Sequence, residues 1–285
     1  MYTCQAPAKV NFGLAVQRKR ADGYHDISTI FVKISLADTL SFVATAQHIV
    51  VHCEHPEVPS DTRNLVYKAA ALLQPLAAWR GVQIHLQKVI PVAAGLGGGS
   101  SDAAATLLGC NTVWGLGLSR AELAAYAAQL GADVPFFLWD GTTALGHGRG
   151  DELTPVQCPG DFALVLVKPP LAVSTAWVYS QLRFELTGPP NNTNILKQHL
   201  ESGDIASLGG GLFNDLEAVV LPRFPVVRTI KQALTRPGVV GVSMSGSGPT
   251  VYALCRSLAV AHDVAMAVQS SQWEVWVCQP WREHS

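Results

Sequence analysis

A glycine-rich stretch in the first half of the chain has the residue types and spacing of a phosphate-binding loop. Residues 91–101 read Pro-Val-Ala-Ala-Gly-Leu-Gly-Gly-Gly-Ser-Ser, so that four glycines fall within five positions. Glycine has no Cβ and accepts positive φ, which lets successive backbone N–H groups point into one concavity. An alanine-rich run follows, which predicts a helix N-terminus whose unpaired amides and positive dipole end attract phosphate. The stretch therefore predicts an anion site rather than a surface linker.

The spacing of this stretch excludes two common phosphate motifs. The P-loop requires a lysine after its last glycine, where this chain has Ser100. A dinucleotide fingerprint that began at Gly95 would require glycine at the same position, so a nicotinamide-dependent oxidoreductase is only a remote alternative. The apolar alternation of Val82, Ile84 and Leu86 before the loop predicts a strand, giving the order strand, glycine loop and helix.

Three other segments carry residues with reactive chemistry, each with a structural alternative. Lys9 stands within a strand predicted over residues 4–16, where a lysine usually extends its ammonium to solvent. Asp133 precedes Pro135 and is either a helix cap or a carboxylate base. Residues 243–250, Ser-Met-Ser-Gly-Ser-Gly-Pro-Thr, form a hairpin turn by themselves. Paired with the first loop, they suggest two glycine-rich segments that close over one phosphorylated ligand.

Composition limits the class of protein. The chain has 285 residues, 48% hydrophobic and 14% charged, which is enough for one large or two ordinary domains. A formal net charge of -1 gives no support for nucleic-acid binding. The six cysteines form no CxxC pair. No run of apolar residues approaches the length of about 18 that a membrane span requires. The N-terminal residues do not have the pattern of a signal peptide. We therefore expect a cytoplasmic protein with reduced thiols.

A histidine cluster offers a conceivable metal site. His48, His52 and His55 lie close together in the sequence, with Cys53 and Glu54 between them. His48 and His52 would share a strand face, as metal ligands could. Alternating polar positions on a strand explain these residues equally well, and we favour surface histidines.

The remaining periodicity predicts strands and helices in two domains, divided near Pro155 and Pro159 into residues 1–157 and 158–285. Strands are expected over 4–16, 48–53, 82–90, 162–167, 239–244, 250–254 and 273–278, a hairpin over 27–36 and 39–45, and a turn-rich hairpin over 141–150. One helix is expected from the end of the glycine loop to about residue 114. Other helices are expected over 64–76, 119–129, 174–182, 195–201, 204–208, 214–220, 224–235 and 258–270, with a loop over 187–193. Asp61 or Thr62 is the expected cap of the first helix, and Ser119 with Glu122 forms a capping box. The continuous apolar strand over 162–167 is typical of a strand buried on both faces.

Taken together, these segments resemble the three motifs of the GHMP kinases, the superfamily that includes galactokinase, homoserine kinase and mevalonate kinase. The first motif resembles residues 6–11 (Ala-Pro-Ala-Lys-Val-Asn), the second residues 91–103 and the third residues 243–250. Within the superfamily, residues 20–25 (Arg-Ala-Asp-Gly-Tyr-His), 95–103 and 131–135 (Gly-Ala-Asp-Val-Pro) resemble the members that phosphorylate a cytidine diphosphate-linked methylerythritol in the non-mevalonate isoprenoid pathway. The resemblance covers the whole chain in order.

The resemblance implies an α/β fold of two domains: an N-terminal domain like domain 2 of ribosomal protein S5 and a C-terminal ferredoxin-like domain, with the active site in the cleft between them. It implies phosphoryl transfer from ATP to the 2-hydroxyl of the cytidylated alcohol, with Mg²⁺ as cofactor. Small molecules are the expected partners, without nucleic acid or membrane, for a monomer or weak homodimer. The alternatives are another GHMP kinase, acting on homoserine or a sugar, and a ligand-binding member without catalysis.

By the same resemblance Lys9 and Asp133 are the catalytic pair, in which Asp133 accepts the hydroxyl proton and Lys9 keeps its carboxylate ionised. The residues expected to bind ATP are Pro91, Val92, Ala93, Ala94, Gly95, Leu96, Gly97, Gly98, Gly99, Ser100 and Ser101. Those expected to bind the acceptor are Asn11, Tyr24, His25, Thr175 and Tyr179, with Gly246, Ser247 and Gly248 of the third motif near phosphate or substrate.

Two of these assignments keep an alternative open. Tyr179 is expected to stack on the cytosine that Tyr24 and His25 bind, but it could equally be a core aromatic on an amphipathic helix. The Mg²⁺ ligands are unassigned, because Asp102, which follows the loop, could serve either the metal ion or the helix N-terminus.

Overall fold

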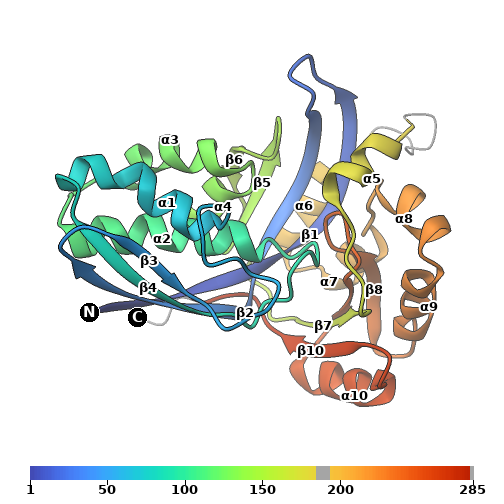
Figure 1. Cartoon of the computed structure of the whole chain (residues 1–285). Coiled ribbons are helices and arrows are strands. Elements are labelled where there is room, and N and C mark those ends of the chain that lie inside the picture. The colour runs from blue at the N-terminus through green and yellow to red at the C-terminus, as the bar shows by residue number, and fades with distance from the viewer. Residues whose placement is uncertain (184–192, 283–285) are drawn as a thin grey trace. The chain divides into compact units, whose positions relative to one another are not determined.

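The computed structural model describes residues 1–183 and 193–282 (Figure 1). Its contacts divide the chain into two compact units, each assembled from three segments. The first unit contains Met1–Ala8, Leu36–Val92 and Gly97–Asp140, and the second contains Lys9–Ser35, Ala93–Leu96 and Gly141–Ser285. The long strands β1 (Tyr2–Lys19) and β2 (His25–Thr45) and the glycine stretch therefore contribute residues to both units. The predicted family-domain boundary at residue 157 stays a prediction.

In the first unit a small sheet is covered by helices. The C-terminal half of β2 pairs antiparallel with β4 (Gly81–Gln87), and β3 (Ile49–His52) pairs parallel with β4. Alternate residues such as Phe42, Val82 and Ile84 are fully buried, as expected for strands with one covered face. Figure 1 shows the helices α1 (Leu65–Leu73), α2 (Gly98–Trp114) and α3 (Arg120–Leu130) on the same side of β3 and β4. A 3₁₀ turn, η1 (Gln74–Ala77), extends α1, and α4 (Val134–Leu138) packs against α2 and α3.

Local side-chain chemistry explains where these helices begin. Helix α2 follows Gly97, whose φ of 71° suits glycine, and Gly115 with a φ of 65° ends it. Ser119 and Glu122 form the predicted capping box of α3, with both reciprocal hydrogen bonds present. The predicted cap of α1 was wrong, because the side chain of Asn64 accepts the hydrogen bond from the Val66 amide instead.

The second unit contains a four-stranded antiparallel sheet with the order β10-β7-β9-β8. Its strands are β7 (Ala163–Lys168), β8 (Val239–Met244), β9 (Val251–Cys255) and β10 (Glu274–Cys278). Helices α5 (Thr175–Gln181), α6 (Thr193–Ser202), α7 (Ile205–Gly210), α8 (Glu217–Arg223) and α9 (Pro225–Leu234) connect β7 to β8, and α10 (Leu258–Val268) connects β9 to β10. This order and connectivity are those of the predicted ferredoxin-like arrangement. Helix α9 packs on β8 and β9, and α10 packs on β7 and β10.

The N-terminal half of β2 also belongs to the second unit. It pairs antiparallel with β5 (Thr143–His147), which in turn pairs with β6 (Glu152–Pro155). The predicted turn-rich hairpin over 141–150 is therefore confirmed, with its strands slightly later in the chain.

One predicted hairpin was wrong. The segments 27–36 and 39–45 form the single strand β2, which continues through Ala37 and Asp38. Asp38 did not form a turn because its carboxylate is buried and accepts hydrogen bonds from the backbone amides of Val89 and Ile90 at 2.5 and 2.8 Å. A tertiary contact thus replaced the local turn that a short polar break indicated.

The strand predicted over 162–167 and the loop predicted over 187–193 can also be compared with the structure. The strand predicted over 162–167 is buried along its length, and both of its neighbours, β9 and β10, run antiparallel to it. The loop predicted over 187–193 lies outside the described residues except for Thr193, which begins α6. Within residues 1–183 and 193–282, no helix is both long and apolar enough to cross a membrane.

The contact between α2 and β2 predicts a stability effect. A methyl group at Gly109 would lie 2.5 Å from the ring of the buried Phe42, closer than carbon atoms can approach. We expect Gly109→Ala to lower the free energy of unfolding by about 1–3 kcal/mol, because overpacking outweighs the roughly 1 kcal/mol gain in helix propensity. Chemical denaturation monitored by circular dichroism measures this change.

The matched control is Gly210→Ala in α7, where an added methyl group meets nothing within 4 Å. This variant should be as stable as the parent or slightly more stable. Equal stability of the two alanine variants would contradict the packing argument.

Candidate active site

The glycine stretch and the third motif meet in the second unit. The Ser245 hydroxyl donates a hydrogen bond to the Gly95 carbonyl oxygen at 2.9 Å, and the Lys9 amide donates to the Leu96 carbonyl at 2.9 Å. A methyl group at Gly95 would lie 2.2 Å from the Ser245 carbonyl oxygen, and the φ of Gly95 is 75°. Only glycine accepts both the close approach and this backbone conformation. The sequence motifs around residues 9, 95 and 245 are therefore in direct contact.

Lys9 is buried, so the expectation for an isolated strand lysine, an ammonium in solvent, does not hold. Its side chain donates to the Asn11 Oδ1 at 2.6 Å, and the Asn11 side-chain amide donates to the Thr29 hydroxyl at 2.9 Å. The ammonium nitrogen also lies 5.3 Å from the centroid of the Phe31 ring. Because burying an ammonium without partners is costly, these contacts hold the charge in place beside Asn11.

Asp133 lies at the N-cap position of α4 and is half-buried, but its side chain makes no capping hydrogen bond. The alternative in which Asp133 is only a helix cap therefore has no side-chain interaction to support it. Asp133 belongs to the first unit and Lys9 to the second, and their pairing stays a prediction.

A buried ion cluster joins the two ends of the glycine stretch in the first unit. The Lys88 ammonium, just before the stretch, contacts the carboxylates of both Asp38 on β2 and Asp102 in α2, the latter at 3.0 Å. The side chains of all three residues are at most 5% exposed. Residue patterns did not predict this cluster, since its members lie apart in the sequence, in β2, in the segment after β4 and in α2.

Burial controls the protonation of this cluster. Desolvation raises the pKa of Asp102 from 3.8 to about 8; the Lys88 ammonium opposes the rise, and the negative charge of Asp38 adds to it. Burial, with a smaller effect of the Asp102 charge, raises the pKa of the Cys4 thiol on β1 to about 12. The structure gives Asp102 a partner in Lys88, and the two alternatives that the sequence left open, the metal ion and the helix N-terminus, stay predictions.

Two buried polar atoms at the start of α2 are unsatisfied. Among the residues that the structure describes, the Ser101 hydroxyl and the Oδ1 atom of Asp102 have no hydrogen-bond partner. An unpaired buried polar group costs about 1–3 kcal/mol, which usually marks a position where a ligand or water completes the site.

The aromatic residues expected to bind the acceptor divide into two groups. His25 and Tyr179 stack directly, with ring centroids 5.1 Å apart and planes inclined by 30°. Burial, with a smaller effect of the Lys19 charge, lowers the pKa of His25. Tyr179 also packs partly against the core of the second unit, so both interpretations of this residue describe part of its surroundings. Tyr24 is 53% exposed and lies against the Arg149 guanidinium, 5.1 Å from its ring centroid.

Helix α5 is tied to the third motif through Thr175. The hydroxyl groups of Thr175 and Ser247 are 2.8 Å apart and share a hydrogen bond. The segment that carries Tyr179 is thus connected to the same motif that contacts the glycine stretch.

The histidine cluster is arranged differently from the predicted metal pair. His52 stacks on His85 of β4, with ring centroids 4.6 Å apart, and the Gln83 amide lies 3.0 and 3.1 Å from their Nε2 atoms. No group of three or more histidine, cysteine, aspartate or glutamate side chains in the described part of the chain could hold a metal ion.

Comparisons with known proteins agree with this arrangement. The family model of the GHMP kinases N terminal domain matches residues 64–141, and that of the GHMP kinases C terminal matches residues 196–274. A crystal structure of 4-(cytidine 5'-diphospho)-2C-methyl-D-erythritol kinase superposes with a TM-score of 0.83 and 34% identity, and covers 98% of both chains. The fold and the three motifs thus define a GHMP kinase.

Two sequence relatives narrow the class. The 4-diphosphocytidyl-2-C-methyl-D-erythritol kinase of Thermosynechococcus vestitus is 42% identical over 98% of this chain and 96% of its own length. The protein of the same name from Geobacter metallireducens is 44% identical over 96% of both chains. The chain belongs to the GHMP kinases and, within them, to the family of the 4-diphosphocytidyl-2-C-methyl-D-erythritol kinases.

The ion cluster predicts a pH dependence of stability. Because the pKa of Asp102 is raised to about 8, the folded protein binds more protons than the unfolded chain between pH 3.8 and about 8. The free energy of unfolding should therefore fall as the pH rises through this window. Asp102→Asn, which keeps the neutral shape, should show a shallower fall. Denaturation of both proteins at several values between about pH 5 and pH 9 measures the difference, and parallel curves would contradict the assignment.

Proposed function

We propose that this protein transfers the γ-phosphoryl group of ATP to the 2-hydroxyl of 4-diphosphocytidyl-2-C-methyl-D-erythritol, giving the 2-phosphate and ADP. The single observation that carries the proposal is the identity of 42–44% to relatives of that name over nearly the whole chain. Membership of the GHMP kinases supports ATP as the donor. The alternatives, a homoserine or sugar kinase and a member without catalysis, have no comparable support.

Residues 91–101 are the proposed site of the triphosphate. The start of α2 supports this role, because its first amides are unpaired within the helix and its dipole favours an anion. The unpaired hydroxyl of Ser101 is a further donor at the same helix end. We place Gly246, Ser247 and Gly248 beside the phosphates or the acceptor, because their segment contacts Gly95.

Mg²⁺ is proposed to enter bound to ATP rather than to a cage of protein ligands. Mg²⁺ keeps several water ligands and commonly takes one or two carboxylates together with substrate phosphates. This mode fits the described residues, which contain no preformed cluster of three ligating side chains. When bound, the ion would neutralise charge between the β- and γ-phosphates.

The chemical step needs a base and a positive charge at the acceptor hydroxyl. We propose that the Asp133 carboxylate takes the proton of the 2-hydroxyl group. The oxygen of that hydroxyl bonds to the γ-phosphorus, and the bond between the γ-phosphorus and the bridging oxygen breaks, so that ADP leaves. Lys9 would keep Asp133 ionised and hold the hydroxyl. Its contact with Asn11 supports this role, because Asn11 can then bind the polyol beside the ammonium.

Recognition of the acceptor is assigned to Tyr24, His25, Thr175 and Tyr179. Stacking on an aromatic side chain contributes about 1–3 kcal/mol per base and tolerates any base, so a hydrogen bond from His25 must supply the preference for cytosine. In the structure the rings of His25 and Tyr179 are in contact. A base between them would have to separate the two rings, which links α5 to the binding event.

Three further expectations are retained as proposals: a boundary between the family domains near residue 157, a cytoplasmic location, and a monomer or weak homodimer. The formal net charge of -1 and the six scattered cysteines support a location with reduced thiols and no polyanionic partner. Light scattering coupled to size-exclusion chromatography measures the oligomeric state directly.

The proposed base predicts the phenotype of Asp133→Asn. Loss of a general base should lower kcat by about 10²–10⁴-fold, and the KM for ATP should stay within about threefold because the triphosphate site is unchanged. ADP release with the cytidylated alcohol, with homoserine and with a sugar as acceptors measures both the activity and its specificity.

Asp140→Asn is the matched control, because Asp140 is also in the first unit, its side chain is 69% exposed, and it forms an ion pair with Arg120. This variant should keep full activity. Near-normal turnover by Asp133→Asn would remove Asp133 from the mechanism, and turnover of homoserine but not of the cytidylated alcohol would overturn the proposed substrate.

A further inference from the structure

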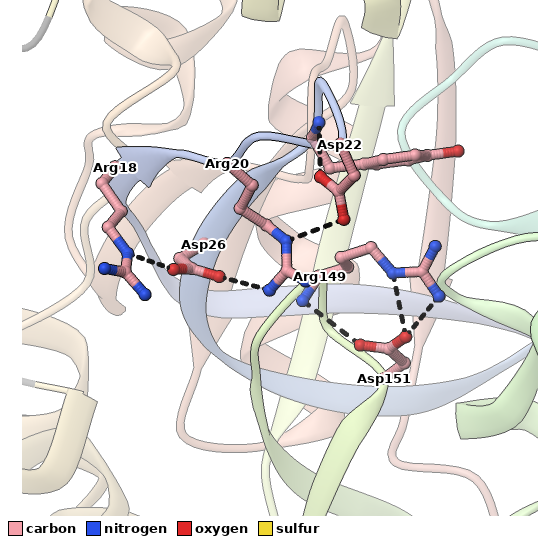
Figure 2. Close-up of polar contacts among 7 residues, drawn as sticks. Arg18, Arg20, Asp22, Asp26, Arg149 and Asp151 are labelled. Carbon is pink, nitrogen blue, oxygen red and sulfur yellow. Dashed lines mark hydrogen bonds and ion pairs between the residues drawn. The ribbon is translucent and has the colours of Figure 1, made fainter.

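The turn that carries Tyr24 is held by a network of arginine and aspartate side chains (Figure 2). The Arg20 guanidinium donates to Asp22 at 3.0 Å and to Asp26 at 2.7 Å, and its backbone amide donates to the Tyr24 carbonyl at 2.8 Å. The Tyr24 amide in turn donates to the Asp22 carboxylate at 3.1 Å. Figure 2 shows Asp26 between the guanidinium groups of Arg18 and Arg20. The backbone of Tyr24 is therefore restrained on both sides of its Cα atom.

The ring of Tyr24 is restrained by a second arginine from a different hairpin. Arg149, in the turn between β5 and β6, places its guanidinium carbon 5.1 Å from the Tyr24 ring centroid. Its Nε and a terminal nitrogen donate to one oxygen of Asp151 at 3.0 and 2.6 Å, as Figure 2 shows. The Ile27 amide also donates to the Gly148 carbonyl at 2.7 Å, which anchors this turn to β2. The position of the guanidinium is thus determined by contacts independent of Tyr24.

Stability alone does not account for this arrangement. Exposed ion pairs contribute about 0–1 kcal/mol, and the Arg149–Asp151 pair is about one quarter exposed. A guanidinium over an aromatic face, by contrast, fixes the plane of the ring. Two nitrogen atoms of the Arg149 guanidinium, Nε and one terminal nitrogen, donate to Asp151 and fix the direction of the group. The contact of the Arg149 guanidinium therefore orients the ring of Tyr24, which is 53% exposed.

We propose that Arg149 is a positioning residue for substrate recognition: held by Asp151, its guanidinium occupies one face of the Tyr24 ring and presents the other face to the cytosine base. This inference rests on the proposed function, which assigns cytosine to Tyr24. Arg149 itself does not touch the substrate. Arg149 limits the orientations of the Tyr24 ring before the base binds, so that less conformational freedom is lost when the base stacks.

Arg149→Met tests the proposal, because methionine keeps an unbranched chain but removes the charge and the fork. We expect the KM for the cytidylated alcohol to rise about three- to tenfold, with kcat and the KM for ATP unchanged. Arg149→Lys keeps the charge but loses the fork, so its KM for the cytidylated alcohol should lie between those of the parent protein and Arg149→Met. Calorimetric titration with CDP should show the same loss of affinity without any turnover.

A double-mutant cycle separates positioning from a general structural effect. In a Tyr24→Leu background, Arg149→Met should have no further effect on the KM for the alcohol, because Arg149 acts through the ring. Arg282→Met is the control: this arginine pairs with Asp161 in the same unit, and both side chains are more than three quarters exposed. The control should leave all kinetic constants unchanged.

The outcomes distinguish this proposal from the proposed function. If the parent protein phosphorylates the cytidylated alcohol and Arg149→Met is unchanged, or its effect persists in the Tyr24→Leu background, the positioning role is overturned and the function stands. If the parent protein has no turnover but binds CDP more tightly than Arg149→Met does, the function is overturned and the positioning role stands. If the parent protein does not bind CDP, both are overturned.

Discussion

The close backbone contact at Gly95 is the constraint on which the site depends. A Cβ atom at this position would lie 2.2 Å from the Ser245 carbonyl oxygen and 3.0 Å from both the amide nitrogen and the carbonyl oxygen of Gly248. Any other residue would push the two glycine-rich segments apart. Because the Lys9 amide binds the neighbouring Leu96 carbonyl, the same displacement would break the connection of β1 to the loop. The absence of a side chain at Gly95 thus allows β1, the glycine stretch and residues 243–250 to lie in contact.

Buried charge is the second constraint, and the buried ammonium groups of Lys9 and Lys88 each have polar partners. Lys9 contacts the Asn11 amide oxygen, and Lys88 contacts the carboxylates of Asp38 and Asp102. The difference between these partners matters. Lys9 thus contacts an amide on its own strand, whereas Lys88 bridges two acidic side chains from β2 and α2. The Lys88 contacts support the glycine stretch, because they join the residues before it to the helix after it.

The turn that carries Tyr24 is less buried than the lysine contacts and is held by directed polar interactions. Tyr24 is more than half exposed, so packing alone cannot set the plane of its ring. Arg149 and the turn around Asp22 provide that restraint with hydrogen bonds and a cation–π contact.

The sequence by itself determined the features that depend on local chemistry. The glycine loop before a helix and the Ser119–Glu122 capping box follow from residue types at short spacings, which local backbone physics interprets directly. The resemblance of three motifs to the GHMP kinases indicated the family. The order of most strands and helices follows for the same reason, since periodicity is a local signal.

Only the tertiary structure decided how distant residues combine. The sequence indicated a turn near Asp38, yet β2 continues because that carboxylate binds Lys88 and the amides of residues 89 and 90, some 50 positions later. The pairing of Tyr24 with Arg149 and of His25 with Tyr179 likewise joins segments with no common pattern. Such contacts depend on which elements the core brings together, and hydrophobic periodicity specifies the faces of elements but not their partners.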